Sequence, residues 1–255
     1  MIPIRVIPCL QLVNDSLVKT VTFNKYTYIG DPINTVRIFN ELEVDELCFL
    51  DIRATNQKRG PNILLLHQIA NECFMPLSYG GGVSDFQTAQ KILSIGFEKI
   101  ILNTQAYLNP DLIRKLSEHF GSQAVMGSLD FKKNIWGKHK VYIQDGKQKT
   151  DLDPVEWAQQ LEALGVGEIL ATSMDKDGTW SGFDVEPLKK IAQAVSVPLI
   201  ANGGAGSIND IGDVVKAGLS AVALGSMVVF QKKGMGVLVN FPDKKKLEEV
   251  IRQVV

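Results

Sequence analysis

Short apolar runs alternate with amphipathic stretches along the whole chain. Stretches with helical period include residues 33–44, 85–96, 110–121 and 153–166. Strands are predicted at the strand-sized apolar runs 4–10, 46–52, 75–81, 99–104, 124–130, 168–174, 198–204 and 221–226. Strands this apolar, separated by helices, indicate a parallel sheet covered on both faces. Eight such units in a chain of 255 residues favour a (β/α)8 TIM barrel. No Pro/Ser-rich linker divides the chain, so we expect a single domain over 1–255.

An internal repeat supports a barrel made of two half-barrels. The segment "LSYGGGV" around Gly82 is echoed by "IANGGAG" around Gly204, and "IILNTQA" around Asn103 by "VALGSMV" around Gly225. Both pairs are 122 residues apart. Ordered matches at one offset indicate four βα units repeated twice.

The repeated glycines follow predicted strands, where the active face of a barrel lies. Gly80 to Gly82, followed by Asn103 and Thr104, predict one phosphate-binding cradle of backbone N–H groups and short polar side chains. Gly203 to Gly206, followed by Gly225 and Ser226, predict a second. Tight turns between strands and helices also use glycine, but two cradles at one barrel mouth favour a substrate with two phosphates.

Two polar residues end equivalent apolar runs. Gln11 ends the first run and Asp130 ends the run at 124–130, so we expect them to face each other across the mouth. A carboxyl can act as a general acid or base, whereas a carboxamide can only orient a ligand by hydrogen bonds. The pair is therefore chemically unequal.

A charged set marks the opposite end of the predicted barrel. Arg5, Glu46, Lys99 and Glu168 each precede or begin a strand. Charges at strand starts are ordinarily solvated, yet two of each sign at related positions permit a ring of ion pairs.

Composition narrows the remaining classes of function. The net charge is −1, from 27 basic and 28 acidic residues, which gives no electrostatic footprint for nucleic acid or an anionic membrane. No apolar stretch reaches the roughly 20 residues needed to span a bilayer. Three dispersed cysteines and three dispersed histidines form no metal-ligand pattern. We therefore expect a cytoplasmic protein without a metal or cofactor.

The combination of "YGGGV", "KIILNT", "GEILATSMDKDGT" and "IANGGAG" resembles the cyclase subunit of imidazole glycerol phosphate synthase, the HisF family. The resemblance covers essentially the whole chain. It implies a half-barrel repeat, a two-phosphate substrate, and a glutaminase partner at the barrel bottom that sends ammonia through the barrel.

The resemblance also assigns roles to individual residues. Asp130 matches one of the family's two catalytic aspartates, and Lys19 matches the basic residue of the mobile first loop. One phosphate site is matched by Gly82, Asn103 and Thr104, and the other by Asp177, Gly178, Gly204, Gly225 and Ser226, with Asp51 in the same substrate region. The ammonia-channel gate is matched by Arg5, Glu46, Lys99 and Glu168.

The departures lie at the mouth. Gln11 stands where the family has its other catalytic aspartate, Asn202 replaces a usual serine, and the loop "VTFNKYTYIGDP" differs. The chain is similar to second copies of this synthase pair found beside surface polysaccharide genes. There the pair is thought to supply ammonia to a sugar amidotransferase that makes acetamidino sugars.

These residues bear on four possible functions. The first is an ammonia-channelling subunit for that amidination, with weak or no cyclase activity. The second is a genuine cyclase of histidine biosynthesis that tolerates Gln11, and the third is a non-catalytic scaffold that activates its glutaminase. A related two-phosphate isomerase is disfavoured because it needs its own acid/base pair and has no use for a gate.

Overall fold

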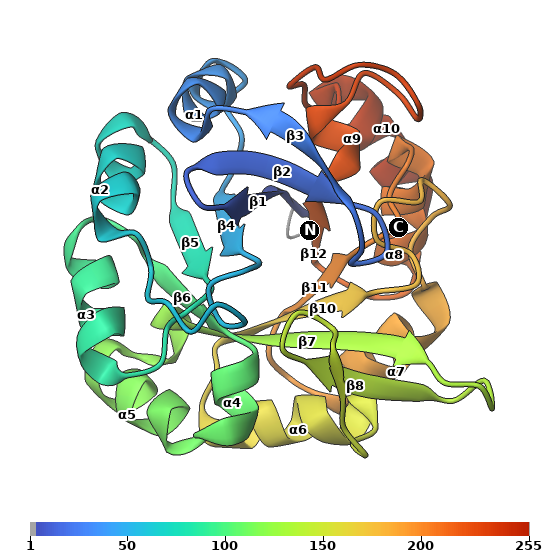
Figure 1. The fold of residues 1–255 in the computed structure, drawn as a ribbon. Helices are drawn as coiled ribbons and strands as arrows, with labels where there is room; N and C mark the ends of the chain where they lie inside the picture. Colours follow the sequence, from blue (N-terminus) through green and yellow to red (C-terminus); the bar gives the residue numbers. More distant parts are fainter. Residues whose placement is uncertain (1–3, 255) are drawn as a thin grey trace.

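The computed structural model describes residues 4–254, which form a (β/α)8 barrel as predicted (Figure 1). The predicted domain includes residues 1–3 and 255, which lie outside the described residues. Parallel strands follow one another around the barrel, and it closes where the fifth strand pairs with the sixth. The barrel strands are β1 (Arg5–Val13), β4 (Leu47–Asp51), β5 (Leu77–Gly80), β6 (Lys99–Leu102), β7 (Val125–Lys133), β10 (Glu168–Ser173), β11 (Leu199–Asn202) and β12 (Ala221–Leu224).

Helices surround the barrel and join successive strands (Figure 1). Several begin at residues that sequence alone marks as helix starts: the side chain of Asp31 accepts a hydrogen bond from Asn34 N, and that of Asp85 accepts one from Thr88 N. The helices are α1 (Pro32–Glu41), α2 (Ile63–Glu72), α3 (Phe86–Ser94), α4 (Thr104–Leu108), α5 (Asp111–Phe120), the 3-10 turn η1 (Ser122–Ala124), α6 (Pro154–Leu164), α7 (Val185–Ala194), α8 (Ile208–Lys216), α9 (Ser226–Val229) and α10 (Lys244–Val254).

The half-barrel repeat is visible in two long strands, β1 and β7. Each has nine residues, and each continues past the barrel into an antiparallel excursion. After β1 come β2 (Ser16–Thr20) and β3 (Tyr26–Gly30), and after β7 come β8 (His139–Ile143) and β9 (Gln148–Lys149). In Figure 1, β7 and β8 project together beyond the ring of helices. The sequence prediction contained the barrel strands but none of these four.

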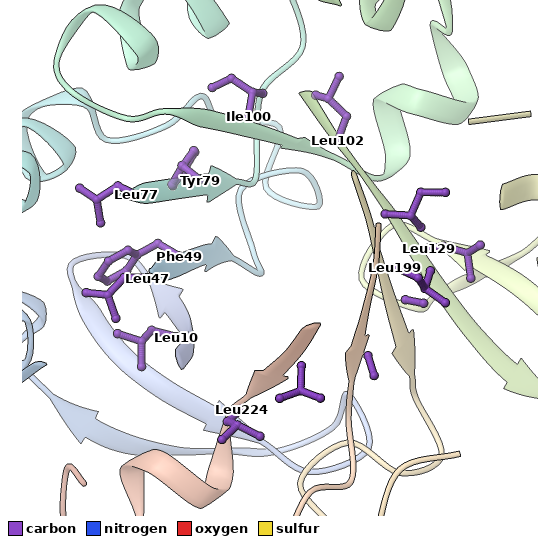
Figure 2. Packing of buried hydrophobic residues seen from close by; sticks show 14 of the residues in the cluster. Leu10, Leu47, Phe49, Leu77, Tyr79, Ile100, Leu102, Leu129, Leu199 and Leu224 are labelled. Carbon is purple, nitrogen blue, oxygen red and sulfur yellow. The ribbon is translucent and has the colours of Figure 1, made fainter. Parts of the chain in front are cut away.

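The strand residues separate into an outer and an inner apolar cluster. Side chains on the outer faces pack against the helices, and Figure 2 shows several of them on strands around the barrel. The alternate positions face the interior, as the two-residue period of a strand requires. The inner cluster consists of Ile7, Cys9, Cys48, Ile101, Met126, Leu170, Ile200, Ala221 and Ala223. This inner apolar layer lies between the two ends of the barrel, where the polar residues gather.

Candidate active site and barrel gate

A cavity opens at the carboxyl ends of the barrel strands. Its lining brings together ten residues that the sequence singled out: Gln11, Asp51, Gly80, Gly81, Gly82, Asn103, Thr104, Asp130, Asp177 and Asn202. Active sites of barrels of this type lie at this end. The cavity is therefore the candidate active site.

Gln11 is held in one orientation by the strand that follows it. Its Oε1 accepts a hydrogen bond from the backbone N–H of Thr20 at 2.8 Å and lies 3.1 Å from the Thr20 hydroxyl. Because a backbone N–H can only donate, the carbonyl oxygen of Gln11 must face Thr20. The NH2 group is left for the cavity, and no described residue accepts from it. Gln11 therefore offers the cavity a hydrogen-bond donor and no titrating group.

Asp130 is a buried carboxyl near the end of β7. Asn103 donates its side-chain N–H to Asp130 Oδ2 at 3.0 Å. Burial raises the pKa of Asp130 to about 7, although hydrogen bonds from Thr172 and Asn103 favour the charged form. A carboxyl with this pKa is protonated in about half of the molecules near neutral pH, so Asp130 can give or take a proton there.

Asp145 is a cavity residue that the sequence prediction missed. It lies in the turn between β8 and β9 and lines the same cavity as Asp130. Its Oδ2 accepts hydrogen bonds from Arg53 Nη1 at 3.1 Å and Asn56 Nδ2 at 3.2 Å. Burial raises the pKa of Asp145 to about 6, against the opposing charges of Arg53 and Lys147. The Asp-Gly pair at 145–146 is a hairpin-turn signal that could have drawn attention to this position.

The first glycine cradle is open to the cavity. Gly81 and Gly82 have φ angles of +119° and +69°, in a region that favours glycine. A Cβ atom on Gly82 would lie 2.7 Å from the carbonyl oxygen of Arg59. Thr104, at the start of α4, accepts a hydrogen bond from Gln144 N at 3.0 Å. The cradle is thus framed by a close backbone contact between the loops after β4 and β5, and by a hydrogen bond from the β8–β9 turn to the start of α4.

The second cradle is covered by the chain itself. Lys19 is buried, and its Nζ lies 2.7 Å from Asp177 Oδ1. A Cβ on Gly225 would lie 2.7 Å from Lys19 Cε, and one on Gly178 would lie 2.6 Å from the carbonyl oxygen of Thr20. Gly178, Gly204, Gly225 and Ser226 accordingly do not line the cavity. The structure therefore keeps the first predicted cradle accessible and places Lys19 over the second.

Asp51 has a different environment from the other cavity carboxylates. It pairs with Arg59 at 2.8 Å and accepts hydrogen bonds from the backbone N–H groups of Arg53 and Ala54 at 3.1 and 3.0 Å. These contacts fix the loop after β4. In this structure Asp51 shapes the wall of the cavity.

The four charged residues at the opposite end of the barrel form a closed ring of ion pairs. Arg5 Nη1 lies 3.1 Å from Glu46 Oε2 and 2.9 Å from Glu168 Oε1. Lys99 Nζ lies 2.8 Å from Glu46 Oε1 and 3.1 Å from Glu168 Oε2. The Glu46 side chain is 6% exposed and that of Arg5 is 30% exposed. Each cation bridges both carboxylates. The ring thus links the beginnings of four barrel strands across the interior.

Nowhere in residues 4–254 do three His, Cys, Asp or Glu side chains gather in a way that could hold a metal ion. No helix in the described part is long and apolar enough to cross a membrane.

Comparison with known proteins agrees with this arrangement. The family described as histidine biosynthesis protein matches residues 5–233. A Pseudomonas aeruginosa protein, named provisionally as imidazole glycerol phosphate synthase subunit hisF2, is 50% identical over 245 residues, covering 96% of this chain and 98% of its own. This chain belongs to the HisF family.

Other HisF relatives carry two kinds of name. A Leptospira interrogans protein, again provisionally named as the HisF subunit of the synthase, is 42% identical over 246 residues, covering 96% of this chain and 97% of its own. The imidazole glycerol phosphate synthase subunit HisF of Alkaliphilus metalliredigens is 41% identical over 224 residues, covering 88% and 89%. The chain is thus a HisF-type barrel with similarity to both extra-copy and ordinary subunits.

Proposed function

We propose that this HisF-family barrel receives ammonia from a glutaminase at its charged end and delivers it to the mouth, for amidination in surface polysaccharide biosynthesis. In this proposal a sugar amidotransferase uses the ammonia to make acetamidino sugars, and cyclase activity is weak. The names of several relatives include a synthase subunit, which supports a role within an assembly with a glutaminase.

The layered interior supports passage of ammonia. The ion-pair ring at one end is followed by the inner apolar cluster, and then by the polar cavity at the mouth. Neutral ammonia crosses an apolar layer at a much lower cost than ammonium, because burying an unpaired charge is expensive. The ring lies between the solvent and this apolar layer. Its ion pairs must separate for a molecule to pass.

The observation that carries the proposal is the state of Gln11. Its Oε1 is bound to Thr20, and the amide has no proton to exchange near neutral pH. Loss of a general acid or base typically lowers a rate by about 10²–10⁴-fold. The side chain of Lys19 lies against Gly225 and is paired with Asp177. In this conformation it occupies the space where a second phosphate would bind.

A genuine cyclase of histidine biosynthesis is the second candidate. Asp130 supports it, because its pKa of about 7 suits acid–base work at neutral pH. The ordinary HisF subunits among the relatives also support it. A scaffold that only activates its glutaminase would not depend on an open barrel interior, and the closed ring gives it no particular support.

The deciding experiment compares the natural protein with a Gln11→Asp variant. Each is purified alone and given ammonium with the bisphosphate substrate of the family, N′-phosphoribulosyl formimino aminoimidazole carboxamide ribotide. We expect the variant to be at least about 100-fold faster than the natural protein. A natural rate of roughly 1 per second or more, typical of enzymes, would instead favour the histidine cyclase.

A further inference from the structure

The mouth holds four carboxyl groups, and they differ in what binds them. Asp51 is paired with Arg59, and both oxygens of Asp177 are engaged, by Lys19 and by the Thr20 hydroxyl. These two groups are held by the protein.

Asp145 has one oxygen held by the protein and one without a protein partner. Both of its hydrogen bonds, from Arg53 and Asn56, are made by Oδ2. Within residues 4–254 the only fully buried side-chain oxygen or nitrogen without a partner is Ser173 Oγ. The other oxygen of Asp145, Oδ1, has no protein partner and is not in that buried class. Because Asp145 lines the cavity, this oxygen is the one left for a ligand there.

The turn that carries Asp145 is built to hold this position. Gln144 and Asp145 have φ angles of +55° and +57°, and Gly146 follows at +71°. The backbone N–H of Gln144 donates to the hydroxyl of Thr104, which also lines the cavity. A Cβ on Gly146 would lie 2.3 Å from Met174 Cε and 3.1 Å from Phe23 Cδ1, so the turn is tightly packed. Two uncommon non-glycine conformations and this packing fix the carboxyl at the mouth.

We propose that Asp145 is the second acid–base residue of this mouth. It works with Asp130 and supplies the proton transfer that the carboxamide of Gln11 cannot perform. The inference rests on the proposed function only in assuming that ammonia reaches this cavity. Asp145 approaches from the β8–β9 turn, whereas Gln11 belongs to β1, so the pair is assembled from a different part of the barrel.

The proposed step can be written with its protons. The lone pair of ammonia forms a bond to a carbonyl carbon of the bound substrate as the C=O π bond breaks toward its oxygen, and the nitrogen becomes positively charged. The carboxylate of Asp145 accepts one proton from that nitrogen. The protonated carboxyl of Asp130 gives a proton to the oxygen that receives the displaced electron pair. Charge is conserved, and no oxidant or reductant is needed.

The surroundings of the two carboxyls fit these roles. Asp145 faces the cation of Arg53, the amide of Asn56 and the cation of Lys147, which favour its charged form, and its pKa of about 6 leaves it mainly ionised at neutral pH. Asp130 forms no ion pair within residues 4–254, and burial raises its pKa to about 7.

Asp130 also faces groups from several elements. Thr172 on β10 and Asn103 after β6 hydrogen-bond to it, while the charges of Asp145 and Asp177 disfavour its ionisation. The cations beside Asp145 favour its carboxylate, whereas burial of Asp130 favours its neutral form. These surroundings make Asp145 the base and Asp130 the acid.

The test uses the slow turnover of the bisphosphate with ammonium, measured from pH 5 to 9. The variants are Asp145→Asn, which keeps an oxygen for Arg53, and Asp151→Asn, a matched control on an exposed residue just beyond β9. We expect Asp145→Asn to lower the natural rate at least about 100-fold. It should also remove the rise in rate through about pH 6, while Asp151→Asn stays within twofold of the natural protein.

A double variant guards against a merely structural effect. If Asp145 supplies the proton acceptor, Gln11→Asp should make it dispensable, and Gln11→Asp with Asp145→Asn should keep at least a tenth of the Gln11→Asp rate. Turnover of Asp145→Asn within threefold of the natural protein overturns the inference. No natural turnover above the protein-free blank also overturns it, but leaves the ammonia-delivery proposal intact. Fast natural turnover that requires Asp145 supports the inference and removes the proposal of a weak cyclase.

Discussion

The buried carboxyl of Asp130 makes the stability of the fold depend on pH. Burial raises its pKa from the ordinary 3.8 to about 7, so the folded protein binds a proton that the unfolded chain has already lost at pH 5. The stabilisation is fully present below pH 3.8 and is lost as the pH rises through about 7. Asp130→Asn removes this titration while keeping an oxygen toward Asn103.

The magnitude follows from the number of protons bound. Each pH unit over which only the folded state is protonated changes the free energy of unfolding by about 1.4 kcal/mol. With a folded pKa of about 7, the folded state holds on average about two-thirds of a proton between pH 5 and 8. The natural protein should therefore lose about 2 to 3 kcal/mol more than Asp130→Asn over this range. The raised pKa of Asp145 contributes to both proteins and largely cancels in the comparison.

The assay is urea unfolding of both proteins, followed by circular dichroism at pH 5, 6, 7 and 8. Asp151→Asn, on the exposed surface, controls for removal of a carboxylate as such and should follow the natural protein. A difference between natural protein and Asp130→Asn that stays below about 0.5 kcal/mol across the range would refute the reasoning. So would a natural protein that gains stability relative to the variant as the pH rises.

Two further perturbations test the ring and the covered cradle. Lys99→Met leaves Glu46 and Glu168 with Arg5 as their only partner in the ring. It should lower the free energy of unfolding, measured by urea titration, by about 3 kcal/mol. A loss below about 1 kcal/mol would mean that the ring rearranges to compensate. Gly204→Ala places a Cβ 2.2 Å from a backbone oxygen at a φ of +113° and should destabilise clearly more than Gly218→Ala. The latter has a φ of +93° and no atom within 4 Å, so it should cost only about 1–2 kcal/mol of backbone strain, and equal thermal shifts for both would contradict the contact argument.

The barrel and its two ends were predictable because each depends on local pattern. Buried parallel strands are almost uniformly apolar, so their positions were clear from the sequence. The ring residues were found because Arg5, Lys99 and Glu168 begin strands and Glu46 directly precedes one. Parallel register then places all four in one layer of the interior.

Two of the excursion strands, β3 and β9, were missed because their residues are mostly exposed and do not have the pattern of a buried strand. Tyr26, Thr27 and Tyr28 of β3 are exposed, and the residues of β9 are also exposed. Without these strands, sequence reasoning had no means to bring Asp145 to the cavity. Nor could it place Lys19 over Gly225, since that contact joins segments about 200 residues apart.

The layered interior also bears on how such a barrel can change. Arg5 and Gln11 lie on the same strand, with Ile7 and Cys9 facing the interior between them. At about 3.3 Å per residue, the ring and the mouth are roughly 20 Å apart along β1. A substitution at the mouth therefore touches no residue of the ring. The two ends can therefore change independently in evolution: substitutions can alter the chemistry of the mouth while the ring of ion pairs at the other end stays the same.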